Sequence, residues 1–290
     1  MGSKDTIFKT LLYSDIFDYP LNKNEIFKFL ALRKIDKNNL DKYLKESVKE
    51  GKLILTDGFY CFPERQKIIA IRLEREKESL RKISRAKKIT KLLNYLPSVK
   101  LIGISGSLAL KNCKKDDDID LFVITGKNSL WLTRLIIIAF LKLGSNYRNY
   151  NSKNVSDKFC LNMLVTEGTM VLPKTKRNFY TSHEVVQLMP LFNRDETYEK
   201  FLGANIWVKK FLPNSLNGIA PKVNENNKNI KVSIFLVSLE SLARRLQLFL
   251  MKKHKTTEII SDDFVAFHPF DYEGWILLSY ERRLKKYGFI

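Results

Sequence analysis

The stretch KLIGISGSLALKNCKKDDDIDLFVIT, residues 100–125, decides the fold that this chain can adopt. Its apolar run at 101–104 is short and rich in β-branched residues, which predicts a buried strand. Gly106 and Ser107 follow at once, and a second apolar run occupies 121–124. The stretch therefore predicts two strands joined by a Gly-Ser turn and a short connection.

Two carboxylates introduce the second of these strands. Side chains alternate along a strand, so Asp118 and Asp120 point to one face while Ile119 points to the other. Two carboxylates this close repel each other, and the pair is costly unless a cation lies between them. Their hard oxygen ligands suit Mg²⁺, which usually binds together with phosphate, and a Gly-Ser turn can offer backbone N–H groups to phosphate oxygens. The alternative is a solvated acidic run, 116–118, before an ordinary strand.

The combined pattern resembles the nucleotidyltransferase superfamily that includes DNA polymerase β, whose signature is Gly-Ser followed by Asp-x-Asp on the next strand. Gly106, Ser107, Asp118 and Asp120 match that signature position by position. The resemblance implies that the turn holds the triphosphate of a nucleoside triphosphate (NTP). It also implies that the two acids are catalytic and hold two metal ions, Mg²⁺ or Mn²⁺, for an in-line displacement.

The third predicted strand, 158–165, departs from the family. Many active members carry a third carboxylate there, which acts as general base toward the acceptor hydroxyl, but no Asp or Glu lies within 159–165. Asn162 occupies the corresponding place. An amide cannot take a proton, yet it can donate to or accept from a substrate or a metal-bound water.

Further contacts with the nucleotide are implied by the family rather than by the residues themselves. The helix expected at 198–211 carries Trp207, which can stack on a base, and Lys209 and Lys210, which can contact the triphosphate. A core tryptophan and a solvated basic helix end are the alternatives. Thr181 and Glu184 are expected to form a capping box at the start of another helix, which ends near Pro190. His183, in the first turn of this predicted helix, is either a base or a structural residue.

The N-terminal segment predicts three short helices and then a hairpin that turns at Asp57-Gly58. This order resembles a winged helix-turn-helix, whose third helix would recognise DNA or RNA through its lysines. Those lysines are Lys37, Lys42, Lys45 and Lys49. Winged helices also serve as protein-docking or structural modules, so the partner of this segment is left open.

The densest basic cluster lies near the C-terminus, at the end of an amphipathic helix expected at 232–251. Arg244 and Arg245 precede Lys252 and Lys253 in this cluster. We expect these four residues to bind nucleic-acid phosphates. Favourable interaction of cations with the end of the helix dipole is the other explanation.

Composition sets the remaining bounds. The 290 residues carry a net charge of +20, which favours RNA or DNA as a partner, although lysine-rich composition throughout the chain is an alternative explanation. Three widely spaced cysteines give neither a disulfide framework nor zinc spacing, which suggests a reducing cytoplasm. The most apolar run, 130–143, is too short to span a bilayer, so we expect no membrane association.

Together these observations predict an α+β protein with four parts. The parts are a winged-helix-like domain at 1–64, a helical connector at 65–97, a small mixed-sheet nucleotidyltransferase core at 98–175 and an α-helical C-terminal domain at 176–290. The cations of the connector are expected on a solvated face, and binding along a phosphate backbone is the alternative. The expected activity is Mg²⁺-dependent transfer of a nucleoside monophosphate from an NTP to a hydroxyl of RNA, DNA, a protein or a small molecule. The alternative is a nucleotide-sensing or inactive core whose winged helix binds nucleic acid or protein.

Overall fold

The computed structural model describes residues 2–149, 154–220, 222, 234–251, 259–266 and 272–290. This part of the chain contains helices and two sheets, which confirms the predicted mixed α+β class. The smaller sheet has three strands and belongs to the N-terminal part. The larger sheet has six strands and carries the two sequence runs around Gly106.

The N-terminal part follows the predicted order of three helices and a hairpin. Its elements are α1 (Ser3–Asp15), β1 (Leu21–Asn22), α2 (Lys23–Lys28), α3 (Lys37–Lys49), β2 (Ile54–Thr56) and β3 (Phe59–Cys61). Asn22 caps α2, because its side chain accepts from the backbone N–H of Glu25 at 2.9 Å. The hairpin turns at Asp57 and Gly58, both with positive φ, as an Asp-Gly turn requires. The assignment of this segment as a winged helix stays a prediction.

The six-stranded sheet has the order β7-β4-β5-β6-β9-β8. Its strands are β4 (Val99–Ile104), β5 (Ile119–Thr125), β6 (Phe159–Thr166), β7 (Met189–Asn193), β8 (Ile259–Ile260) and β9 (Phe264–Ala266). Strands β5 and β6 are parallel, and the other pairs are antiparallel. The two strands expected around the Gly-Ser turn are therefore neighbours in the middle of the sheet.

The C-terminal region is not purely α-helical as expected, because it supplies β7, β8 and β9. Strand β7 lies at the edge of the sheet and pairs only with β4, where Gly103 faces Pro190. Proline is tolerated on an edge strand because one side of the strand needs no donor. The proline that was expected only to end a helix therefore lies inside a strand.

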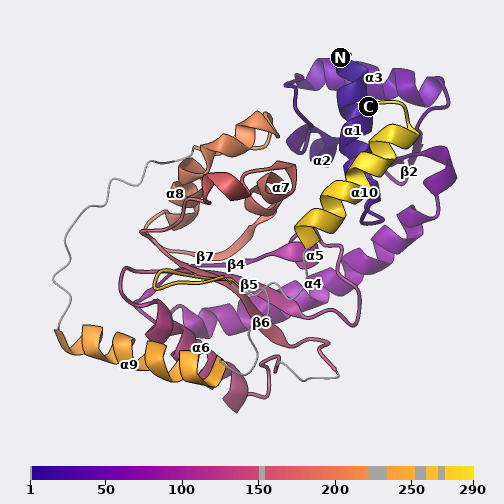
Figure 1. Ribbon diagram of the computed structural model, residues 1–290. Coiled ribbons are helices and arrows are strands. Elements are labelled where there is room, and N and C mark those ends of the chain that lie inside the picture. The colour runs from indigo at the N-terminus through magenta and orange to yellow at the C-terminus, as the bar shows by residue number, and fades with distance from the viewer. Residues whose placement is uncertain (1, 150–153, 221, 223–233, 252–258, 267–271) are drawn as a thin grey trace.

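The remaining helices lie on the two faces of the six-stranded sheet or against the N-terminal part. They are η1 (Pro63–Arg65), α4 (Ile68–Leu93), α5 (Gly106–Ala109), α6 (Leu130–Leu143), η2 (Lys174–Lys176), α7 (Phe179–Gln187), α8 (Thr197–Ala204), η3 (Ile206–Lys210), α9 (Ile234–Met251) and α10 (Tyr272–Lys286). In Figure 1, α4, α6 and α9 lie on one side of the sheet, and α7 and α8 lie on the other. The C-terminal α10 runs alongside α1, so the two ends of the chain lie together.

Two apolar clusters form the main core, one on each face of the sheet. The first joins the N-terminal helices to α7, α8 and α10, and it includes Phe122 and Ile124 of β5. The second packs α4 and α6 against the opposite face, and it includes Leu121 and Val123. Because β5 alternates between the two clusters, Asp120 shares the face of Phe122 and points toward α7 and the N-terminal part.

Helix α4 is not the solvated basic stripe that its sequence suggests, since two of its cations are buried. The side chain of Lys82 is fully buried, and its Nζ donates to the carbonyl oxygens of Lys115 and Asp117. Arg72 is also buried, lies over the ring of Tyr19 and pairs with Glu25 at 2.8 Å. The connector thus fixes the segment that leads into β5.

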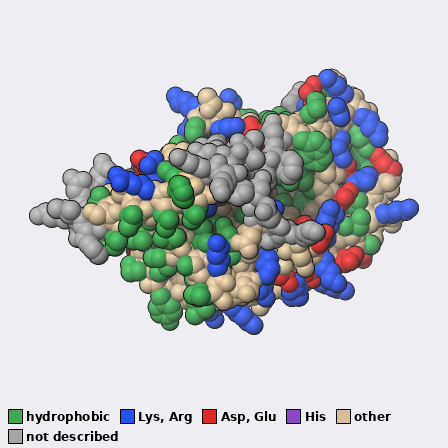
Figure 2. All heavy atoms as spheres, turned by 60° about the horizontal axis from the view of Figure 1, so that its bottom comes forward, with side chains coloured by type: hydrophobic (Ala, Val, Ile, Leu, Met, Phe, Trp, Pro, Cys, Tyr) green, Lys and Arg blue, Asp and Glu red, His purple; other side chains and the backbone are tan. Residues whose placement is uncertain are grey.

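Helix α9 presents most of its expected apolar stripe outward. Leu242 and Leu250 are more than half exposed, and apolar side chains gather on the face shown in Figure 2. The contact of α9 with α6 is instead partly polar, because Glu240 accepts from the backbone N–H groups of Trp131 and Leu132 at 2.7 and 2.8 Å. Glu240 therefore caps α6.

Candidate functional site

The Gly-Ser turn lies directly against one of the two predicted metal-binding acids. Strand β4 ends at Ile104, and Gly106 adopts φ +65°, a left-handed conformation that glycine takes without strain. A Cβ at Gly106 would lie 3.4 Å from Oδ2 of Asp120. The hydroxyl of Ser107 donates to Oδ2 of Asp117 at 3.3 Å. A turn and an acid 14 positions apart in the sequence thus form one contiguous surface.

Asp118 and Asp120 lie close together, as the alternation of β5 predicts. Cys160, which faces Asp120 across the parallel β5–β6 pair, joins them. One ligand atom from each of the three residues falls within 4.8 Å of the others. Burial, and then the charge of Asp118, raises the pKa of Asp120 to about 8. A bound cation would offset both effects, so the donor set fits a metal ion.

Cys160 was missed as a site residue, although its place opposite Asp120 follows from the predicted strand alternation. Burial raises the pKa of its thiol well above the usual range, and the charge of Asp120 raises it further. A thiol that keeps its proton is a poor ligand, and hard cations prefer oxygen. The two carboxylates, rather than Cys160, are the groups suited to Mg²⁺ or Mn²⁺.

Arg148 supplies the positive charge that lies next to the two acids in the structure. It lies between α6 and β6, and its Nη1 is 2.6 Å from Oδ2 of Asp118. Its backbone N–H donates to the carbonyl of Phe159 at 2.9 Å, which ties the segment to the start of β6. The polar composition of 145–156 gave no signal for this contact, because only the pairing of two distant segments creates it.

Asn162 lies where the missing third carboxylate was expected. The β5–β6 register shifts between Leu121 and Phe122, and Asn162 is the extra residue of that irregularity. Its Nδ2 is 3.4 Å from Oγ of Ser105, and the side chain lines the same cavity as the acids. The carboxamide is therefore available to a ligand at this point on β6.

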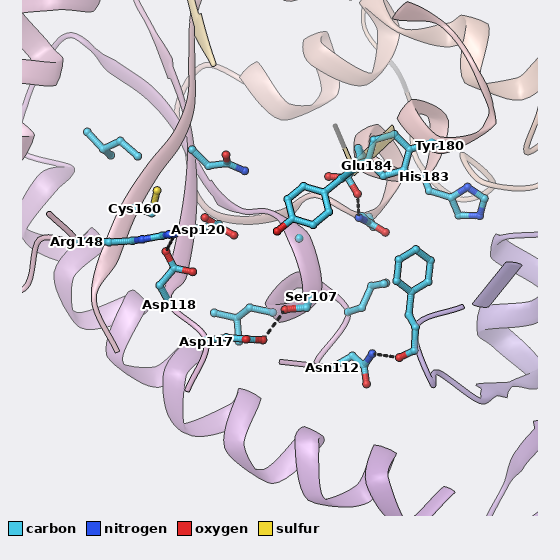
Figure 3. A pocket seen from close by; sticks show the side chains of 18 of the residues that line it. Ser107, Asn112, Asp117, Asp118, Asp120, Arg148, Cys160, Tyr180, His183 and Glu184 are labelled. Atoms are coloured by element: carbon cyan, nitrogen blue, oxygen red, sulfur yellow. Dashed lines mark hydrogen bonds and ion pairs between the residues drawn. The ribbon is translucent and has the colours of Figure 1, made fainter. Parts of the chain in front are cut away.

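The acids line a cavity of about 950 Å³ that continues well beyond the sheet. Figure 3 shows the labelled residues on its two sides. We call one side the acid end, which consists of Asp118, Asp120, Arg148, Cys160 and Asn162. The other side, the aromatic end, is lined by Tyr13, Phe17, Phe29, Tyr180, His183, Glu184, Gln187, Tyr272 and Ile276. The cavity thus reaches from the core strands to α1, α7 and α10.

His183 is a structural member of the aromatic end rather than a base. Its ring stacks on Tyr13 at 4.0 Å between centroids, and Phe29 stacks at 5.7 Å. Its Nδ1 lies 2.9 Å from the carbonyl of Phe179, so this nitrogen carries the proton and donates. Burial lowers the pKa of His183 to about 4, and the ring is neutral at physiological pH.

Glu184 was expected in a capping box with Thr181, which the structure corrects. Helix α7 begins earlier, because Asn178 is the N-cap and accepts from the backbone N–H of Thr181 at 3.0 Å. Glu184 consequently lies inside the helix and faces the cavity, where its Oε1 accepts from Nε2 of Gln187 at 2.5 Å. Burial raises the pKa of Glu184 to about 7.

The structure does not bring the other predicted site residues to the cavity. Lys209 and Lys210 are exposed on η3 and are not among the lining residues of the cavity, whereas Val208 of the same turn is buried in the core. Trp207 packs against the core and donates to Oδ1 of Asn205 at 3.0 Å, which is the core alternative for this residue.

The predicted nucleic-acid site is described only in part, since Lys252 and Lys253 lie outside the described residues. Arg244 pairs with Asp262 at 2.7 Å, and Arg245 is exposed on α9 beside the apolar side chains of its outer face. Neither arginine lines the cavity. Phosphate binding by this cluster stays a prediction.

None of the described helices combines the length and the apolar character needed to cross a membrane. The chain was also compared with protein-family models, with curated proteins and with solved structures, and none of the three comparisons gave a match. The chemistry of the cavity is therefore the basis for assigning a function.

Proposed function

We propose that the protein is a metal-dependent nucleotidyltransferase that transfers a nucleoside monophosphate from an NTP to a hydroxyl group. The observation that carries this proposal is the contact between the glycine turn and the acid pair. Gly106 lies next to Asp120, and Asp118 lies on the same side of the strand as Asp120. A turn suited to phosphate and a pair of hard ligands suited to Mg²⁺ share one wall of a cavity of about 950 Å³.

The residues of the acid end have separate roles in this proposal. The carboxylates of Asp118 and Asp120 would hold Mg²⁺ or Mn²⁺, and Arg148 would leave Asp118 for the phosphates when the cation binds. A divalent cation bound there supplies positive charge for the triphosphate and for the charge that develops during transfer. Ser107 and the backbone of its turn would hold the outer phosphates, and Asn162 would orient the acceptor or a water molecule.

The transfer itself is an in-line displacement. The acceptor oxygen forms a bond to the α-phosphorus, and the bond from that phosphorus to the oxygen bridging to the β-phosphate breaks. The electron pair leaves with pyrophosphate, and the hydroxyl proton is released to water. The chain contributes by holding the two oxygens in line and by excluding other orientations.

Incubation with each α-labelled NTP, Mg²⁺ or Mn²⁺ and a panel of alcohols tests the proposal. The native chain should transfer label, whereas the Asp118→Ala, Asp120→Ala double variant should lose about 1,000-fold or more of the activity. Asp116→Ala is the matched control, because Asp116 is exposed in the same acidic run and does not line the cavity.

One observation favours a second function, nucleotide sensing without transfer. Within the described part of β6 no carboxylate faces the acceptor side, and Asn162 cannot take a proton. Tight, metal-dependent NTP binding with no transfer under any condition would support the sensor and overturn the transferase. Absence of both binding and transfer would overturn both functions.

A further inference from the structure

The aromatic end differs from an ordinary apolar pocket because a single side chain is charged among the described residues that line it. The lining residues that α1, the following segment to Phe29, α7 and α10 contribute are apolar, aromatic or neutral polar, with the exception of Glu184. Tyr13, Phe17, Tyr180 and Tyr272 supply ring surface around it. The end is thus a set of aromatic rings with one carboxylate.

No cation of the described chain compensates this carboxylate. The Glu184 carboxylate accepts a hydrogen bond from Gln187, and no Lys or Arg of the described residues influences its pKa. At the acid end, by contrast, Arg148 pairs with Asp118. A buried carboxylate without a cation is costly, and its cost is offset when a ligand brings the missing charge.

The surrounding groups respond to the charge of Glu184. It is the largest cause of the raised pKa of Tyr180, and it also raises the pKa values of Tyr13 and Asp120. Three elements, α1, α7 and β5, therefore face the same negative charge. The faces of aromatic rings attract cations as well, so the rings and the carboxylate favour the same kind of ligand.

We propose that the aromatic end binds the protonated amine of a small molecule, with Glu184 as its ion-pair partner and the tyrosine and phenylalanine rings around it. Combined with the proposed function, on which this last step rests, the molecule is the acceptor. Its amine would occupy the aromatic end, and a hydroxyl at its other end would face Asp118 and Asp120. The acceptor is then an amino alcohol rather than a nucleic acid.

The shape of the cavity agrees with a small acceptor. The N-terminal part closes the aromatic end through Tyr13 and Phe29, and no residue of its predicted recognition helix α3 is among the lining residues. Lys45, one of the α3 lysines predicted to contact nucleic acid, instead pairs with Asp41 of the same helix at 2.8 Å. The winged-helix-like segment thus serves as a wall of the pocket.

The test compares two probes of similar size, trans-4-aminocyclohexanol and cyclohexane-1,4-diol, whose main difference is the ammonium group. Ligand-observed NMR at pH 8 should show that the native chain binds the amine at least about 10-fold more tightly than the diol, the gain expected for one desolvated ion pair with aromatic contacts. Glu184→Gln should abolish this preference while leaving diol binding unchanged. Glu281→Gln, an exposed change on α10, should leave both affinities unchanged.

The outcomes separate this inference from the proposed function. The binding assay needs neither NTP nor metal, so the Asp118→Ala, Asp120→Ala variant should still prefer the amine. Equal binding of amine and diol, or a preference that survives in Glu184→Gln, would overturn the amine site even if label transfer succeeds. Preference for the amine without label transfer would uphold the amine site and leave the transferase overturned. If Glu184→Gln fails to fold, Tyr180→Leu should reduce the preference by weakening the ring contact.

Discussion

The two ends of the cavity differ in how the negative charge of their carboxylates is compensated. Each holds buried carboxylates whose pKa values rise, to about 8 for Asp120 and about 7 for Glu184. At the acid end the chain supplies a compensating cation, Arg148, 2.6 Å from Asp118. At the aromatic end the described residues supply a hydrogen bond from Gln187 and no cation. In the function that we propose, Arg148 takes the place of the metal ion at the acid end, and at the proposed amine site the ligand itself supplies the compensating charge.

This difference has a thermodynamic meaning. A group whose pKa is raised by folding makes the folded state less stable once that group ionises. Asp120 recovers part of this cost through Arg148, which lowers its pKa, whereas Glu184 recovers only what Gln187 provides. Residues that lower the stability of the folded state in this way are common in binding sites, because a bound ligand stabilises the folded state again.

The largest expected effect concerns the acid end. Replacing Asp118 and Asp120 together by asparagine should abolish Mn²⁺ binding at this site, with a loss of about 100-fold or more for each ligand removed. Electron paramagnetic resonance of added Mn²⁺ measures the free ion directly. The change should leave amine binding at the aromatic end intact, because Glu184 lies on a different element.

Asp116→Asn is the control, since Asp116 is exposed in the same run and does not line the cavity. Mn²⁺ binding that persists in the double variant would place the cation elsewhere. It would also remove the contrast between a metal end and an amine end.

The two ends also differ in how far the sequence could predict them. The closeness of Asp118 and Asp120 to the turn at Gly106 and Ser107 was predicted, because these four residues lie within 15 positions and the alternation of a strand fixes the relation between the two acids. Local spacing carries this information without knowledge of the rest of the fold. Cys160 lies on the strand face that the same alternation defines, so it was also within reach.

The aromatic end could not be predicted because its residues come together only through tertiary packing. This end brings together Tyr13, Phe29, Glu184 and Tyr272, and the first and last of these residues are 259 positions apart in the sequence. Each of the four resembles an ordinary helix residue in its own segment. Glu184 was assigned to a capping box because the true N-cap, Asn178, begins the helix three residues before Thr181. Local patterns therefore misplaced the one charge that distinguishes this end.

Charge patterns were the least informative signal. The cations of α4 predicted a solvated face, yet Lys82 and Arg72 are buried and hold the chain leading into β5 and the α2 region. The amphipathic pattern of α9 likewise did not show which face is covered, and Leu242 is 63% exposed. A helix periodicity shows that two faces differ, but only the packing partner decides which face is covered.

The second prediction uses the pH dependence of stability at the aromatic end. The pKa of Glu184 in the folded state, about 7, lies above the ordinary value of 4.5 for this side chain, so the folded state binds the proton more tightly. The contribution of Glu184 to the free energy of unfolding is fully present below pH 4.5. It falls as the pH rises toward 7, by at most about 3 kcal/mol. Glu184→Gln removes the titration, so this variant should gain stability relative to the native chain between these pH values.

Urea unfolding of both chains at pH 5 and pH 8 measures this effect. The difference between Glu184→Gln and the native chain should be small at pH 5 and should favour the variant at pH 8. Glu281→Gln provides the contrast, because Lys285 lowers the pKa of Glu281. The stability from Glu281 is already present above pH 4.5, so the difference between this variant and the native chain should stay nearly constant from pH 5 to pH 8. A difference for Glu184→Gln that stays constant with pH would show that Glu184 does not titrate in this range.

The smallest expected effect comes from alanine substitution at two glycines with positive φ. Comparing the two variants distinguishes the cost of backbone strain from an effect on ligand binding at the acid end. Gly106 has φ +65° beside Asp120, and Gly58 has φ +80° in the hairpin, with no atom within 4 Å of a Cβ placed there. Alanine at either position should cost about 1 kcal/mol in unfolding experiments, because an L-residue is strained in this region. Only Gly106→Ala puts a methyl group 3.4 Å from Oδ2 of Asp120, where the phosphates and the cation would approach. Calorimetric titration with ATP and Mg²⁺ should therefore show weaker binding for Gly106→Ala and native affinity for Gly58→Ala, and equal affinities in the two variants would place the triphosphate away from this turn.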